Sequence, residues 1–218
     1  MVNVAQLVEP RIVVPVVVGS SPIVHPTKVQ NMLIIISGPS GVGKGTLIRY
    51  VLSRQPTVCL SVSATTRPPR TEDVDGKTYH FLSDDAFDQY VNDDAFLEWC
   101  TVHTARYGTL RHDVQTKQTT FDAVIVEVDV QGAKKIRASY EGNQHHIFIR
   151  PPSLQTLEDR LKGRNTDDDS TIQRRLMVSK REIDHQSDYD TIITNNELTQ
   201  SCIDINNIVM RLCRQGVR

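Results

Sequence analysis

The chain has 218 residues, of which 39% are hydrophobic and 23% are charged, and its formal net charge is −1. These values are typical of a globular protein with one substantial core. Because the net charge is close to zero, overall electrostatics does not favour a nucleic-acid or membrane partner. The four cysteines lack the spacing of a metal site, so we interpret them as reduced thiols of a cytoplasmic protein.

The first 31 residues differ from the rest of the chain. Four prolines rule out one continuous helix here, and the apolar run 12–18 is too short to span a bilayer. One arginine precedes this run and no small-residue cleavage site follows it, which argues against a signal peptide. The segment resembles a peptide translated from a transfer-RNA gene. We therefore predict that residues 1–31 are a non-native or disordered extension and that the natural start is Met32.

From Met32 onward, strand-like and helix-like segments alternate. The apolar and β-branched runs predict strands at 32–36, 58–66, 122–130, 145–150 and 190–195. Helical spacing of apolar residues predicts helices at 45–55, 131–140, 153–164 and 197–215. Strands separated by helices predict an α/β fold with a mainly parallel sheet flanked by helices.

The pattern changes between residues 64 and 120. Short alternating strands at 78–83 and 95–103 flank a helical run at 84–93, which predicts a small α+β insertion. A second interruption, the polar and charge-dense stretch 163–175, links two helical runs, and such segments are often lids. We therefore divide the chain into a core (32–63 and 121–218), the insertion (64–120) and a lid (about 160–175).

A glycine-rich loop follows the first predicted strand. Its sequence, GPSGVGK, fits the pattern G-x-x-x-x-G-K, in which backbone N–H groups turn toward phosphate oxygens and the lysine reaches the β- and γ-phosphates. The helix that follows adds the positive end of its dipole. We therefore predict an ATP site formed by Gly38, Pro39, Ser40, Gly41, Val42, Gly43, Lys44, Gly45 and Thr46.

Gly45 stands where such loops usually carry a hydroxyl residue that binds Mg²⁺ directly. Mg²⁺ keeps several waters, and substrate phosphates and carboxylates can hold it through those waters. Glu127 and Asp129, at the end of an apolar run, are suitable carboxylates. We therefore expect Mg²⁺ near these two residues without a direct protein ligand, and Thr46 in contact with phosphate.

Further motifs resemble those of guanylate kinase, a P-loop nucleoside monophosphate kinase. They are SVSATTRPPR (61–70), GKTYHF (76–81), FLEW (96–99), RYGT (106–109) and VEVDVQGA (126–133), in the order found in that family. The resemblance implies a P-loop kinase with a GMP-binding insertion and a lid. It also implies ATP-dependent phosphorylation of GMP, and of deoxy-GMP, to the diphosphate by direct in-line transfer with Mg²⁺, within purine nucleotide metabolism and GMP recycling.

The resemblance gives a role to each matching residue of the GMP site. Arg67 and Arg70 would hold the phosphate as a pair of guanidinium forks, helped by two tyrosine hydroxyls. Glu98 would accept the N–H groups at guanine N1 and N2, a pair of donors that adenine lacks. The predicted GMP site comprises Ser63, Arg67, Arg70, Tyr79, Glu98, Tyr107, Thr109, Glu127 and Asp129.

The remaining positive charge would come from the lid. Arg160, Arg164 and Arg175 match the family arginines that close over the triphosphate, and with Lys44 they are the predicted catalytic residues. We interpret Arg174 as a solvated residue. The expected partners are ATP with GMP or deoxy-GMP; no nucleic-acid or membrane partner is expected, and a homodimer is left open.

Two other functions remain as alternatives. Some guanylate-kinase-like domains of scaffolding proteins bind phosphopeptides, but these generally have a degraded phosphate loop, whereas this chain keeps Gly43 and Lys44. A kinase for AMP or a phosphorylated sugar would suit the G-K-G-T ending of the loop. Glu98 and the insertion as a whole oppose that interpretation.

Overall fold

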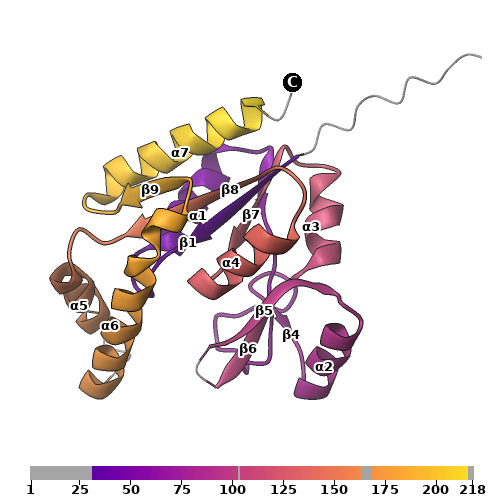
Figure 1. The fold of residues 1–218 in the computed structure, drawn as a ribbon, viewed down its shortest axis with the longest axis horizontal. Helices are drawn as coiled ribbons and strands as arrows, with labels where there is room; N and C mark the ends of the chain where they lie inside the picture. The colour runs from indigo at the N-terminus through magenta and orange to yellow at the C-terminus, as the bar shows by residue number, and fades with distance from the viewer. Residues whose placement is uncertain (1–30, 103, 164–167, 216–218) are drawn as a thin grey trace, which may run out of the picture.

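The computed structural model describes residues 31–102, 104–163 and 168–215, so the predicted extension 1–31 lies almost wholly outside the described residues. The core is a five-stranded sheet in the order β2-β7-β1-β8-β9, with every pair parallel (Figure 1). Its strands are β1 (Met32–Ser37), β2 (Val58–Leu60), β7 (Ala123–Glu127), β8 (Gln144–Arg150) and β9 (Thr191–Thr194). The predicted α/β class with a mainly parallel sheet is confirmed.

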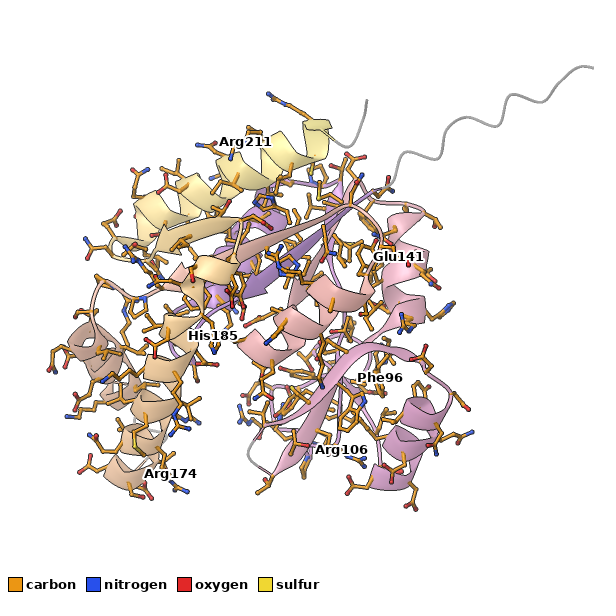
Figure 2. The ribbon with its side chains drawn as sticks, in the orientation of Figure 1. Phe96, Arg106, Glu141, Arg174, His185 and Arg211 are labelled. Carbon is orange, nitrogen blue, oxygen red and sulfur yellow. The ribbon has the colours of Figure 1, made fainter. Side chains whose placement is uncertain are left out.

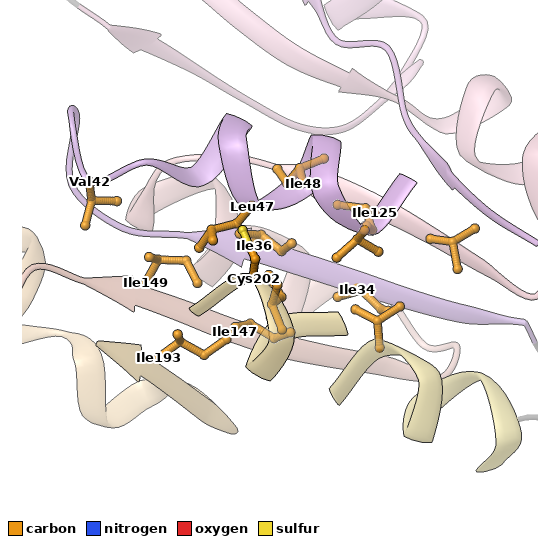
Figure 3. Packing of buried hydrophobic residues seen from close by; sticks show 14 of the residues in the cluster. Ile34, Ile36, Val42, Leu47, Ile48, Ile125, Ile147, Ile149, Ile193 and Cys202 are labelled. Carbon is orange, nitrogen blue, oxygen red and sulfur yellow. The ribbon is translucent and has the colours of Figure 1, made fainter. Parts of the chain in front are cut away.

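Helices cover both faces of this sheet because the side chains of β1 alternate between two apolar clusters. Ile34 and Ile36 enter the larger cluster, which packs against α1 (Lys44–Arg54), α5 (Leu154–Lys162), α6 (Asp169–Asp184) and α7 (Leu198–Gln215) (Figure 3). Leu33 and Ile35 enter the smaller cluster beneath α3 (Arg111–Gln118) and α4 (Val130–Ser139). Each of these four β1 side chains is fully buried, which stabilises the fold by about 1.5–3 kcal/mol per residue.

A second sheet lies between β2 and α3 in the chain. Its order is β4-β3-β6-β5, formed by β3 (Ala64–Thr65), β4 (His80–Phe81), β5 (Phe96–Val102) and β6 (Ala105–Leu110). Helix α2 (Asp84–Asn92) packs on it through Phe87, whose ring stacks on Phe96 at 4.6 Å between centroids. Trp99 packs edge-on against Phe87 at 6.1 Å, and the Lys135 ammonium of α4 lies 5.2 Å from the Trp99 ring.

Two groups of elements extend beyond the core, one on each side of the same end of the parallel sheet. Helices α5 and α6 extend on one side, and the second sheet with α2 extends on the other (Figure 1). The phosphate loop follows β1, and Glu127 ends β7, so both lie at the carboxyl ends of the strands. Open parallel sheets bind ligands at this edge.

Several predicted elements have different bounds in the structure. The predicted strand 58–66 is two strands in different sheets, β2 and β3, and the predicted strand 122–130 ends at Glu127. The stretch 163–175 is not a polar link throughout, because α6 begins at Asp169. The Asp168 side chain caps this helix, and Ile172 and Leu176, one turn apart, pack into the core. Helix α3 and strand β6 were not expected.

None of the described helices is both long and apolar enough to cross a membrane.

Candidate active site

The phosphate loop joins β1 to α1, and its backbone requires glycine at its first position. Gly38 has a φ of 140°, and a Cβ there would overlap the carbonyl oxygen of Ile149 on β8. Gly43, with a φ of 101°, is the N-cap of α1, so Lys44 is the first helical residue. The loop therefore presents its backbone at a helix N-terminus, the arrangement that binds phosphate.

Lys44 folds back over this loop. Its Nζ atom donates hydrogen bonds to the carbonyl oxygens of Gly38, at 2.7 Å, and Pro39, at 3.3 Å. The same atom lies 4.0 Å from Oε1 of Glu127, which is paired in register with Ile36 of β1. An ammonium held by neutral carbonyls and one partly exposed carboxylate is available to a more highly charged phosphate group.

Gly45 has room for a larger side chain. A Cβ there would have Arg49 Nη1 as its nearest described neighbour, at the ordinary contact distance of 3.6 Å, and its φ lies outside the left-handed region. The exposed Thr46 next to it accepts a hydrogen bond from Arg49 at 3.2 Å. Space alone therefore does not explain the glycine at position 45.

Substitution Gly45→Ser is expected to leave the rate of phosphoryl transfer within about tenfold of the wild type, or about 1.4 kcal/mol, if Mg²⁺ is held through water. Steady-state kinetics at saturating Mg²⁺ measures this, with Gly45→Ala as the matched variant that adds the Cβ without the hydroxyl. A gain of several orders of magnitude for serine alone would show that the glycine loop lacks a metal ligand that the reaction requires.

One cavity of about 350 Å³ connects the loop with the second sheet. The residues that line it include Gly38, Ser40, Lys44, Ser63, Tyr79, Glu98, Tyr107, Glu127, Asp129 and Glu182. Most of them were predicted as site residues from separate parts of the sequence. Their convergence makes this cavity the candidate active site.

Glu98 is the most buried acidic residue of the cavity, with 5% of its surface exposed. Its Oε1 atom accepts a hydrogen bond of 2.8 Å from the Thr109 hydroxyl, which places Thr109 behind the carboxylate. Its Oε2 atom is buried without a hydrogen-bond partner among the described residues. Burial raises the pKa of Glu98 to about 7; the charge of Asp129 acts in the same direction, and the Thr109 hydrogen bond and Lys135 oppose it. An orphaned buried acceptor is satisfied when a ligand donates to it.

Arg67 is already paired in this structure. It binds Oδ2 of Asp73 at 2.8 Å and the carbonyl of Pro68 at 2.7 Å, and its guanidinium lies 5.5 Å from the Tyr79 ring centroid. The same Asp73 oxygen accepts the backbone N–H of Arg70, whose own side chain is exposed. Asp73 therefore fixes the turn between the two arginines, and an incoming phosphate would share Arg67 with it.

The predicted lid arginines have different environments. Arg160 donates to the carbonyls of Asn195, at 2.9 Å, and Val42, at 3.5 Å, and the Asn195 amide also binds Val42, so Arg160 is tied to the phosphate loop. Arg175 is half-buried on α6, and Arg164 lies outside the described residues. Arg174 is exposed near the start of α6, far from the core sheet (Figure 2).

The family model for guanylate kinase matches residues 30–212 of this chain. The chain belongs to the guanylate kinase family. It is 39% identical over 175 residues to a guanylate kinase of Synechocystis sp., covering 80% of this chain and 91% of the relative. It is 42% identical over 183 residues to that of Thermosynechococcus vestitus, covering 84% and 95%. The crystal structure of guanylate kinase from Anaplasma phagocytophilum superposes with a TM-score of 0.66 at 26% identity, covering 83% of this chain and 85% of that one.

The structure adds residues to this guanylate kinase site that the sequence interpretation missed. Glu182 of α6 lines the cavity, and burial raises its pKa to about 7 against the opposing charge of Lys44. It lies about two helical turns after Arg175 and thus on the same side of α6, which the sequence does not reveal unless both residues are placed in one helix. Cys100 also lines the cavity, and its thiol lies 3.6 Å from Oδ2 of Asp129.

Proposed function

We propose that this chain transfers the γ-phosphoryl group of ATP to GMP, which gives ADP and GDP. The observation that carries this proposal is that one cavity has both Lys44 of the phosphate loop and Glu98 of the second sheet in its wall. Phosphoryl transfer needs a donor and an acceptor held in line within one enclosed space. Membership of the guanylate kinase family supports the same activity.

The second sheet would bind the acceptor. The ionised Glu98 would accept the N–H groups at guanine N1 and N2, with Thr109 and Ser63 completing the contacts to the base. Arg67, Arg70, Tyr79 and Tyr107 would bind the GMP phosphate. Asp129 also lines the cavity, and its Oδ1 atom accepts the Gly132 N–H at 2.7 Å, which caps α4.

The phosphate loop would bind the donor. Backbone N–H groups from residues 38 and 40–46 would surround the phosphates, and Lys44 would exchange its two carbonyl partners for phosphate oxygens. An oxygen of the GMP phosphate would form the new bond to the γ-phosphorus while the bond to the ADP oxygen breaks. Lys44, Arg160, Arg164 and Arg175 would stabilise the charge on the group in transfer.

The oxygen donors of the cavity fit a hydrated Mg²⁺. Glu127 and Asp129 both line it, and 39% of the Glu127 side chain is exposed beside Lys44. These carboxylates would hold the waters of the ion, which suits a loop with glycine at position 45. When bound, Mg²⁺ would neutralise charge on the donor phosphates.

We also propose that residues 64–120 act as the GMP-binding unit, with 32–63 and 121–218 as the core and about 160–175 as the lid. The four strands of the second sheet, which all lie within residues 64–110, support this division. The cysteines are unpaired thiols, in keeping with a cytoplasmic enzyme.

Release of ADP from ATP and Mg²⁺, measured with GMP, AMP, CMP or UMP as the acceptor, tests the proposal. Turnover is expected with GMP and not with the others, because among these four bases only guanine presents adjacent N–H donors at N1 and N2 to Glu98. Turnover with AMP in place of GMP would contradict the assignment of Glu98. Binding of GMP without any ADP release would contradict the enzymatic function itself.

A further inference from the structure

Gly132 lies directly against the carboxylate of Glu98. It is the third residue of α4, and a Cβ placed on it would lie 2.7 Å from Oε2 and 3.0 Å from Cδ of Glu98. It would also lie 3.1 Å from Cβ of Val128. Cβ atoms do not approach other heavy atoms as closely as 2.7 Å, so an alanine at this position would displace Glu98 or the helix.

The backbone gives no reason for glycine at this position. Gly132 has helical geometry and is not among the described glycines with a positive φ. Glycine within a helix costs about 1 kcal/mol relative to alanine. The absence of a side chain is therefore costly for α4 and requires another explanation.

Glu98 has little freedom to move away. Its Oε1 atom is held by the Thr109 hydroxyl at 2.8 Å, and Glu98 and Thr109 are directly paired in the β5–β6 ladder. Glu98 is buried on β5, and Oε2 occupies the space that a Cβ on Gly132 would take. Thr109 on one side and the bare backbone of α4 on the other thus fix the orientation of the carboxylate.

We propose that Gly132 is a specificity-determining residue, because its missing side chain lets the Glu98 carboxylate hold the orientation that receives guanine. The inference rests on the proposed function, in which Glu98 binds the base. Gly132 acts through Glu98 and is therefore a positioning residue. It works together with Asp129, which caps the same helix turn through the Gly132 N–H.

Substitution Gly132→Ala is expected to raise the KM for GMP at least about tenfold, because the added methyl displaces the carboxylate. The KM for ATP and kcat are expected to stay within about threefold, since the phosphate loop is untouched. Ala138→Gly, on the exposed side of α4, is the matched control for a change of helix propensity and is expected to leave the KM for GMP unchanged. A merely structural role would lower the thermal midpoint and affect both substrates alike, and that result would overturn the inference.

A double-mutant cycle with Glu98→Asp tests the contact itself. Aspartate is one methylene shorter, so it leaves room for a Cβ at position 132, and Glu98→Asp is itself expected to bind GMP more weakly than the wild type. Adding Gly132→Ala to Glu98→Asp is expected to change the KM for GMP less than about twofold, a strongly non-additive result. Full additivity would overturn the inference, and the double variant answers the question even if Gly132→Ala alone does not fold.

The wild-type chain separates this inference from the function on which it rests. If the wild type shows no GMP-dependent ADP release, the proposed function is wrong. If the wild type is active and Gly132→Ala has an unchanged KM for GMP, the function stands and the role of Gly132 is wrong.

Discussion

Replacing Lys44 with alanine is expected to lower kcat by at least about a thousandfold, or about 4 kcal/mol, with the dissociation constant of GMP changed less than about threefold. Lys44 belongs to the phosphate loop side of the cavity, whereas Glu98 of β5 and Tyr107 of β6 line it from the second sheet, so the substitution changes only the phosphate-loop side. The loss should fall on kcat because Lys44 would stabilise charge that develops during transfer.

Single-turnover kinetics measures the rate of phosphoryl transfer, and equilibrium binding measures the dissociation constant of GMP. Lys134→Ala, which removes an exposed lysine of α4, is the matched control for loss of one positive charge and is expected to behave as the wild type. Loss of GMP binding together with turnover in Lys44→Ala would contradict the assignment of two separate substrate sites.

Substitution Glu98→Gln is expected to weaken GMP binding about a hundredfold at pH 8, or about 2.7 kcal/mol, because an amide presents a donor where guanine also presents donors. The pH dependence should change as well. Burial raises the pKa of Glu98 to about 7, and only the ionised form accepts both guanine N–H groups. Wild-type affinity for GMP is therefore expected to fall as the pH drops below about 7, approaching tenfold per pH unit, whereas Glu98→Gln should show no such slope.

Titration of GMP between pH 5.5 and 8.5, a range of about 1.5 units on either side of the pKa, measures this slope. Burial also raises the pKa of Glu182 to about 7, so Glu182→Gln is the necessary second variant. It is expected to keep the wild-type slope in the absence of ATP, because Glu182 faces Lys44 and Asp129 from α6. If the slope disappears in Glu182→Gln and persists in Glu98→Gln, the group that controls GMP binding is Glu182, and the prediction for Glu98 is wrong.

The phosphate loop and the parallel sheet were predictable from sequence because their causes are local. The glycines of the loop, the apolar run 32–36 and the helical spacing after Lys44 each act within one turn or one strand. The α/β class follows from such segments in alternation. The roles of the individual site residues remain predictions, but the structure places Ser63, Tyr79, Glu98 and Tyr107 on the same cavity as Lys44.

The features that were missed depend on contacts between distant segments. Helix α6 begins within a polar run whose only local signals are the cap at Asp168 and the pair Ile172 and Leu176. The run 58–66 looks like one strand, but Val58 and Ala64 pair with different sheets. The approach of Gly132 to Glu98 depends on how α4 packs against β5, which neither segment specifies alone.

Trp99 is the single tryptophan of the chain, and it directly follows Glu98 on β5. Its indole lies on the opposite face of the strand from the carboxylate, between Phe87 of α2 and Lys135 of α4. Fluorescence excited selectively in tryptophan therefore originates at one known position, next to Glu98 in the chain and in contact with α2 and α4. The chain thus carries an intrinsic optical reporter, with which nucleotide binding can be followed in unlabelled protein and without turnover.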